Sequence, residues 1–362
     1  MYPRLTINLK KLKQNLDAVA KITTQQGDCS LMIVTKGMCA DEKVVTLVLD
    51  DERVGYLADS RIENIKTFAE KAASKGKETV LLRLPMHCEI EDVIRYVDLS
   101  FNSEISTIRL LSEEAVRQEK THKILLMIDL GDLREGIYCE DELAIFEIVA
   151  EIFKLENIDL IGVGVNLTCY GAIVPKNNNL SLLVDIAEKL EKKFGVKLKM
   201  RSGGNSSSIY LIWGSQLPSG INNLRLGEGF MLGNETAFGE DIPNTVRDAL
   251  ILEAQIIELQ EKPSLPIGEA SVDAFGQKPC HEDKGIMKRA ILAIGKQDTD
   301  DGSMTPQDKD VDILGCSSDH FILDVSKSSM DYKVGDIISF EIGYGSLLRA
   351  STSKYVHKHY IV

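Results

Sequence analysis

The sequence predicts an α/β fold, a TIM-type (β/α)8 barrel followed by a C-terminal β domain. Short apolar runs alternate with amphipathic helical patterns through the first two thirds of the chain, as expected for parallel strands joined by helices. Eight such strand–helix units favour closure into a barrel over the alternative, an open doubly wound sheet. After about Phe238 the long helical patterns stop and strand-like segments succeed one another.

The predicted barrel strands are apolar runs, in chain order Leu31–Val34, Val54–Leu57, Val80–Leu84, Asp98–Phe101, Ile124–Ile128, Leu160–Val165, Leu198–Met200 and Leu224–Leu226. Helices are predicted between them at Ile62–Lys71, Ile105–Glu119, Asp141–Leu155 and Leu180–Phe194. Asp41 marks an expected helix start, and Ser60 with Glu63 has the spacing of a capping box.

The C-terminal part has strand patterns separated by Gly, Pro, Asp and Ser turns, at Leu250–Ile257, Ala290–Ile294, Ile313–Cys316, Phe321–Val325, Ile337–Ile342 and Val356–Val362. Segment 297–310 is polar and is predicted to be an exposed loop, and no long helix is predicted in this part. We therefore expect a barrel over residues 1–238 and a β domain over 239–362, with Leu5–Ile7 a candidate to join the β domain.

Composition narrows the function classes. The 362 residues carry a formal net charge of −13, which argues against nucleic acid or an anionic membrane surface as partner. Seven cysteines without a C-x-x-C pair predict neither a disulfide framework nor a zinc ribbon, so a cytoplasmic location is the simplest expectation. The N-terminus has no apolar signal region, and no apolar run approaches the roughly 20 residues of a membrane span.

Lys36 comes after the first predicted strand, at the barrel face where such enzymes keep their chemistry. Desolvation there lowers the pKa of an amine, which prepares it to form a Schiff base with an aldehyde. An isolated lysine at a strand end more often extends to solvent, so the prediction depends on the residues at the ends of the other strands.

Four further polar segments lie near the ends of strands five to eight: 129–136, 166–171 and 202–208 follow strands five to seven, and 225–229 begins on strand eight. The third of these is rich in glycine and then serine and runs into a predicted helix at Ile209–Trp213. Glycines admit a ligand close to the backbone, and serine hydroxyls with helix amides can hold a phosphate, although a flexible turn is the alternative. Its place after strand seven favours the phosphate site.

These segments resemble the fold-type III pyridoxal-phosphate enzymes, and within them the alanine/ornithine racemase family. The resemblance runs from end to end through 34–36, 58–65, 129–136, 166–171, 202–208, 224–228, 273–276, 315–320 and 344–345. It implies pyridoxal 5'-phosphate as cofactor, an amino acid, with ornithine favoured, as substrate, and a homodimer whose active sites are shared across the interface.

The resemblance also implies roles for single residues. Lys36 matches the Schiff-base lysine, Arg225 the arginine that faces the pyridine nitrogen, and Arg134 an arginine near the cofactor's phenolate and the substrate carboxylate. A cation beside the pyridine nitrogen disfavours its protonation and favours simple return of the proton to the substrate. The residues that match the phosphate site are Asn205, Ser206, Gly227, Glu228 through its backbone amide, and Tyr344.

The chain departs from the alanine racemases at two positions. Asn166 stands where they have a histidine, so the contact of that histidine with the cofactor is replaced or lost. Segment 268–276 lacks the tyrosine that serves as their second acid/base, and Asp273 is the nearest ionisable candidate, with a turn aspartate as the alternative. Asp319, in a segment that faintly resembles a motif of basic-amino-acid decarboxylases, is a candidate substrate contact from the partner.

We therefore predict a racemase that exchanges the α-proton with two acid/bases, Lys36 and Asp273. One alternative is a decarboxylase of basic amino acids. The other is a non-catalytic pyridoxal-phosphate carrier, and the added β domain counts against this second alternative. A metal-dependent aldolase or dehydratase lacks its expected ligands, and His357 and His359 fit a solvent-exposed strand better than a metal site.

Overall fold

The computed structural model describes the whole chain except residues 273–274, 277 and 279–281. It contains two compact units, one formed by residues 12–246 and the other by residues 1–11 together with 247–362. They are called the barrel unit and the β unit below.

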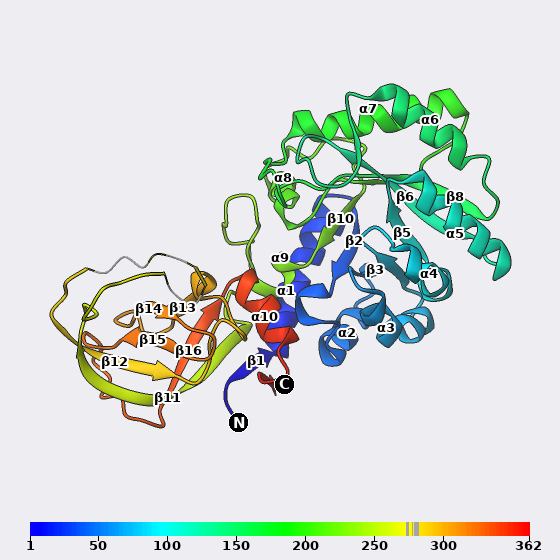
Figure 1. The fold of residues 1–362 in the computed structure, drawn as a ribbon. Helices are drawn as coiled ribbons and strands as arrows, with labels where there is room; N and C mark the ends of the chain where they lie inside the picture. The colour runs from blue at the N-terminus through cyan, green and yellow to red at the C-terminus, as the bar shows by residue number, and fades with distance from the viewer. Residues whose placement is uncertain (273–274, 277, 279–281) are drawn as a thin grey trace. The chain divides into compact units, whose positions relative to one another are not determined.

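The barrel unit contains a closed ring of eight parallel strands, as predicted (Figure 1). The strands are β2 (Ser30–Val34), β3 (Val54–Asp59), β4 (Glu78–Leu81), β5 (Leu99–Asn102), β6 (His122–Asp129), β8 (Ile158–Gly164), β9 (Met200–Ser202) and β10 (Asn223–Leu226). Pairing of β10 with β2 and of β5 with β6 closes the ring, and the two-residue strand β7 (Ile137–Tyr138) extends β6 at its edge. Closure brings all eight carboxyl ends to one face.

Most residues of the barrel strands are buried whichever side they face, which explains why the sequence shows these strands as largely apolar runs. Leu31–Val34 is buried throughout, for example. The interior of the barrel is filled by side chains from most of the strands, namely Met32, Val34, Ala58, Val80, Leu99, Phe101, Leu125, Met127, Ile161 and Met200. The barrel is therefore a packed core, and the chemistry has to lie at its ends.

Helices alternate with the strands around the outside of the barrel (Figure 1). They are α1 (Leu9–Ala20), α2 (Glu42–Leu49), α3 (Ile62–Ser74), α4 (Ile90–Tyr96), α5 (Ile105–Arg117), α6 (Glu142–Ile152), α7 (Asn177–Phe194), α8 (Tyr210–Trp213) and α9 (Glu228–Leu232). Asp41 caps α2 as predicted, because its carboxylate accepts from the amides of Lys43 and Val44.

The capping box predicted at Ser60 and Glu63 is wrong. Helix α3 has Arg61 at its N-cap and no side-chain cap. The carboxylate of Asp59, buried at the end of β3, accepts instead from the Arg61 amide at 3.0 Å and from Asn64 Nδ2 at 3.0 Å. An aspartate that ends a strand can thus satisfy the first turn and leave the serine without that role.

The β unit is an antiparallel sheet in the order β13-β16-β11-β12-β15-β14. Its strands are β11 (Leu250–Pro263), β12 (Ile286–Leu292), β13 (Met304–Pro306), β14 (Asp312–Cys316), β15 (Phe321–Asp324) and β16 (Ile337–Ile342). The first strand of the chain, β1 (Arg4–Asn8), pairs antiparallel with β11 and parallel with β17 (His357–Ile361). The two ends of the chain therefore lie side by side in this unit.

The prediction that segment 297–310 is an exposed loop is wrong for part of the segment. The segment contains a 3₁₀ turn at 301–303 and strand β13, and Thr299 is fully buried. It binds a helix that was not predicted, α10 (Tyr344–Thr352), through Thr299 Oγ1 and Ser303 Oγ, which lie 3.0 and 2.9 Å from Ser346 Oγ. Polar side chains can be buried when they satisfy one another in this way, so polarity alone did not indicate exposure.

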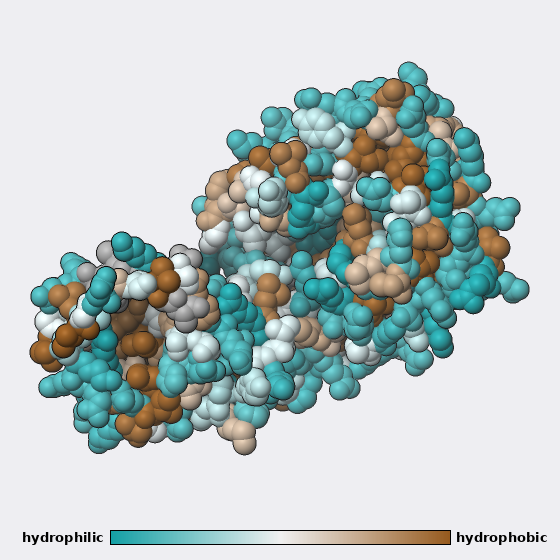
Figure 2. Space-filling model, in the orientation of Figure 1, coloured by the Kyte–Doolittle hydropathy of each residue, from teal (hydrophilic) through white to brown (hydrophobic). Residues whose placement is uncertain are grey.

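Large apolar side chains reach the surface of the β unit, where Figure 2 shows brown patches among polar residues. Ile267 is 97% exposed, and Ile286, Met330 and Val334 are at least 60% exposed. Contiguous exposed apolar surface often marks an interaction site. No helix in the described part of the chain is long and apolar enough to cross a membrane.

His122 begins β6 and is almost fully buried against β5. Its Nε2 lies 2.7 Å from Ser100 Oγ, which also accepts from Asn102 Nδ2 at 2.9 Å. The serine hydroxyl can donate to Nε2 only when that nitrogen carries no proton, as in a neutral imidazole. Burial lowers the pKa of His122 from 6.5 to about 4, against an opposing backbone hydrogen bond at Val97.

This burial predicts a pH-dependent loss of stability. Because the unfolded state binds a proton near pH 6.5 and the folded state only near pH 4, stability falls as the pH drops through this window. Between pH 7 and pH 5 the His122 contribution amounts to about 2 kcal/mol. Urea unfolding of wild type and His122→Asn at both pH values measures it, and an equal loss in the two proteins would contradict the prediction.

Candidate functional site

Lys36 lies just beyond the carboxyl end of β2 and begins a 3₁₀ turn, Lys36–Met38. The turn ends in Cys39 and Ala40, two consecutive residues with a left-handed backbone (φ +50° and +51°). Residues other than Gly and Asn rarely adopt this backbone conformation. Burial lowers the pKa of the Lys36 amine, with Cys169 acting in the opposite direction and Arg134 in the same direction. A partly desolvated amine of this kind is a competent nucleophile.

The backbone before Lys36 is fixed to the neighbouring strand. Thr35 donates from its amide to the Ala58 carbonyl at 2.9 Å and from its hydroxyl to Asp59 Oδ2 at 2.8 Å. Asp59 is fully buried, and burial raises its pKa even though these hydrogen bonds favour the carboxylate. The amine therefore extends from a rigid base, with a buried acid near it.

Arg225 lies on β10 and is 3% exposed. Its guanidinium donates to Ser202 Oγ, the Val165 carbonyl and Asn166 Oδ1, each at 2.6 Å, and its Cζ lies 5.2 Å from the centre of the Phe101 ring. Burial lowers the pKa of Arg225 to about 10. At neutral pH the barrel thus presents a buried, positively charged guanidinium at this end.

Asn166 links this guanidinium to a carboxylate. Its Nδ2 donates to Glu135 Oε1, and the same carboxylate forms a two-point ion pair with Arg134, through Nε to Oε2 and through Nη2 to Oε1 at 2.6 Å. Arg134, Glu135, Asn166 and Arg225 therefore form one connected network over the ends of β6, β8 and β10.

Asp132 joins the loops that carry these residues. It is buried, and its carboxylate accepts from the amides of Tyr170 at 3.0 Å and Ile173 at 3.2 Å, in the loop after β8. Thr168 in that loop has φ +66°, an unusual conformation for a β-branched residue. Such strain persists only where the surroundings enforce it, and Asp132 holds the same loop two and five residues further along the chain.

The loop after β9 forms a compact turn. Asn205 Oδ1 accepts from the Ser207 amide at 2.8 Å, and Ser206 Oγ accepts from the Gly229 amide at 3.0 Å, near the start of α9. Asn205 also donates to Cys169 Sγ at 3.3 Å. Gly227 packs so closely on β2 that an added Cβ would lie 3.2 Å from Val34 Cβ. The loop of residues 202–208, called the serine loop below, is thus linked to a segment that packs on β2, the strand that precedes Lys36.

The barrel unit brings eight of the predicted site residues to the carboxyl ends of its strands, namely Lys36, Arg134, Asn166, Asn205, Ser206, Arg225, Gly227 and Glu228. Glu228 begins α9, and its carboxylate accepts from Asn234 Nδ2 at 3.4 Å. Two others belong to the β unit, where Tyr344 begins α10 and Asp319 lies in an exposed turn and accepts from Ser318 Oγ at 2.6 Å. Asp273 lies outside the described residues.

The sequence did not assign roles to several residues that build the site, above all Glu135, Ser202, Asp59 and Cys169. Glu135 stood in the segment after strand five, next to a selected arginine, and this adjacency was the available signal. That its carboxylate also reaches Asn166 depends on how the loops fold over the barrel.

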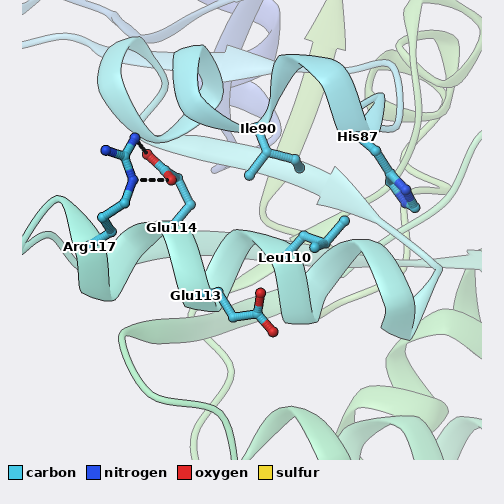
Figure 3. A pocket seen from close by; sticks show the side chains of 6 residues that line it. All are labelled: His87, Ile90, Leu110, Glu113, Glu114 and Arg117. Atoms are coloured by element: carbon cyan, nitrogen blue, oxygen red, sulfur yellow. Dashed lines mark hydrogen bonds and ion pairs between the residues drawn. The ribbon is translucent and has the colours of Figure 1, made fainter.

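A shallow pocket of about 270 Å³ lies away from these residues (Figure 3). It is lined by His87, Ile90, Leu110, Glu113, Glu114 and Arg117, from the outer helices α4 and α5 and the turn before them. Arg117 pairs with Glu114 along one side. Within the described ranges, no cluster of three or more His, Cys, Asp or Glu side chains is placed to hold a metal ion.

Comparison with known proteins identifies relatives over the full length. Residues 7–234 match the family model "Alanine racemase, N-terminal domain". The chain is 53% identical to ornithine racemase of Acetoanaerobium sticklandii and 38% identical to lysine racemase of Thermotoga maritima, with 99% of each chain covered in both cases. An alanine racemase structure from Bartonella henselae with covalently bound pyridoxal phosphate aligns with a TM-score of 0.70 at 15% identity, covering 99% of both chains.

We predict that Asp132→Ala loosens the loop after β8. The substitution leaves the Tyr170 and Ile173 amides without their charged acceptor, and such a bond contributes about 1.5–3 kcal/mol. Hydrogen–deuterium exchange in peptides covering 169–174 should therefore accelerate about tenfold to hundredfold. Asp141→Ala is the control, because it removes an exposed cap from Ala144 only. Unchanged exchange at 169–174 would show that Asp132 does not hold this loop.

Proposed function

The chain belongs to the alanine racemase family, and we propose that it is a pyridoxal-phosphate-dependent racemase that interconverts L- and D-ornithine. The observation that carries the proposal is 53% identity with an ornithine racemase over essentially the whole of both chains. The arrangement of the barrel unit supports it, because a desolvated amine, Lys36, lies at the same end as two arginines, Arg134 and Arg225.

The residues present fit the cofactor. Ser207 Oγ in the serine loop is among the buried side-chain atoms of the described chain that have no hydrogen-bond partner, and a phosphate oxygen is a suitable acceptor for it. Asn205, Ser206, Gly227, the Glu228 amide and Tyr344 would hold the phosphate. Bound pyridoxal phosphate supplies an electron sink that acidifies the proton on the substrate's Cα.

Arg225 would face the pyridine nitrogen and Arg134 the phenolate side and the substrate carboxylate. A guanidinium donates but cannot accept a proton, so Arg225 would disfavour protonation of that nitrogen. An arginine at this position would therefore favour return of a proton to Cα over competing reactions of the substrate.

Racemisation needs one acid/base on each face of Cα. Lys36 takes and returns the proton on one face. For the other face we propose Asp273, with Asp319 as a substrate contact, both from the partner in a homodimer. The exposed apolar side chains of the β unit are compatible with such an interface. A basic substrate fits the two basic-amino-acid racemases among the relatives.

The experiment that tests the function is incubation of the purified protein with the L and D forms of ornithine, lysine and alanine, followed by chiral analysis. We expect interconversion of ornithine, and release of CO₂ without a change of configuration would indicate a decarboxylase instead. Lys36→Ala should reduce the rate by at least about 10³-fold, because the nucleophile and one acid/base are lost together. Borohydride should fix the cofactor on Lys36 in wild type and in the control Lys43→Ala. Label on another residue would contradict the role of Lys36.

We predict that Asp273→Asn affects the two enantiomers unequally. Loss of one acid/base slows exchange of the α-proton with D₂O in one enantiomer more than in the other, by about tenfold to 10³-fold. Mixing Lys36→Ala with Asp273→Asn protein should then restore part of the activity, since one of the mixed sites carries both native residues. Equal exchange rates for both enantiomers in the variant would make Asp273 a turn residue.

A further inference from the structure

The buried guanidinium of Arg225 has three hydrogen-bond acceptors, and all three are uncharged. A cation taken out of water is costly unless an anion compensates for it. The carboxylate that compensates for the charge of Arg225 does not bind it directly, because Asn166 lies between the two. Glu135 lies on the far side of Asn166, and it stabilises the charged form of Arg225, whereas Arg134 acts against it.

The orientation of Asn166 is determined by its neighbours. A guanidinium can only donate and a carboxylate can only accept, so the amide oxygen must face Arg225 and the amide nitrogen must face Glu135. The amide therefore transmits the position of the carboxylate to the guanidinium, because neither end can be reversed without losing a bond at both sides.

The same carboxylate also fixes the second arginine. Glu135 engages Arg134 through both oxygens, a geometry that determines the plane of the guanidinium as well as its position. Together, Glu135, Arg134 and Arg225 carry one net positive charge. Glu135 also favours the protonated form of Lys36, so its charge acts on all three cations of the site.

We propose that Glu135 is a positioning residue for the reaction, which holds Arg134 directly and Arg225 through Asn166 and so sets the direction and charge of both guanidinium groups that face the cofactor. This inference rests on the proposed racemase function and goes beyond it, because it assigns control of the two arginines to a residue that touches neither cofactor nor substrate. Asn166, which stands where the alanine racemases have a histidine, then has the role of linking a carboxylate to Arg225.

The test compares Glu135→Gln, which removes the charge and keeps the shape, with Glu135→Asp, which keeps the charge on a shorter side chain. Glu140→Gln is the matched control, because it removes a carboxylate from an exposed position of the same connection. The first readout is the pH titration of the absorption spectrum of the bound cofactor, and the second is kcat and KM for ornithine.

Loss of an anion from a cluster of cations disfavours protonation nearby. We therefore expect Glu135→Gln to lower the midpoint of the spectral titration by about one pH unit and kcat by about tenfold or more. Glu135→Asp should recover part of both, and Glu140→Gln should leave both unchanged. A residue that merely stabilised the loop would reduce the amount of folded enzyme without moving the midpoint.

A double-mutant cycle tests the connection through Asn166. If the amide acts by linking Glu135 to Arg225, Asn166→Ala should cost much less in kcat when Glu135 is already Gln, and the double variant should lose no more than about threefold beyond the worse single variant. Losses of kcat that multiply independently in the double variant would contradict the link through Asn166. An unchanged midpoint of the spectral titration in Glu135→Gln would contradict it as well. An active wild type with unaffected variants refutes this inference alone, whereas a wild type without cofactor or racemisation refutes the proposed function and the inference together.

Discussion

A guanidinium buried at the end of a closed barrel has to be supplied with acceptors, and much of the site is a consequence of that requirement. Arg225 lies on β10, and its partners come from the end of the adjacent strand β9 and from the residues just after β8, the next strand along the sheet. Ser202 ends β9 and accepts from the guanidinium while it donates to Asn223 Oδ1 at 2.5 Å. The Val165 carbonyl comes directly after β8. The hydrogen bonds of Ser202, Asn223 and Asn166 thus form one network around a single cation.

Closure of the barrel makes this arrangement possible. Around the ring, β10 and β6 are separated by β9 and β8, and the curvature of the closed sheet turns the ends of all four strands toward one opening. In the ring, the loops after β6 and β8 fold over the same opening, and Asp132 joins them through two backbone amides. The loops can then bring Glu135 to Asn166, while the apolar interior below them excludes water and strengthens each polar contact.

Sequence patterns predicted the barrel well because most residues of its strands are buried, and apolar runs such as Leu31–Val34 are hard to mistake. Strand β13 has three residues and ends in Pro306, so it left no pattern. Helix α10 contacts Thr299 through the Ser346 hydroxyl, and the sequence gives no sign of this contact between distant residues. The resemblance selected Lys36, Arg134 and Arg225, but it could not select Glu135, whose role depends on contacts between loops.

The asparagine at position 166 illustrates how charge and hydrogen bonding limit the choice of residue. The position has to accept from Arg225 and donate to Glu135 at once, and a neutral amide does both at any pH. A histidine could do so only as one neutral tautomer, and its protonated form would place a third cation beside Arg225 and Arg134. With Glu135 in place, protonation of such a histidine would be favoured. The carboxylate and the amide are therefore consistent as a pair, and a change at one position alters what the other can be.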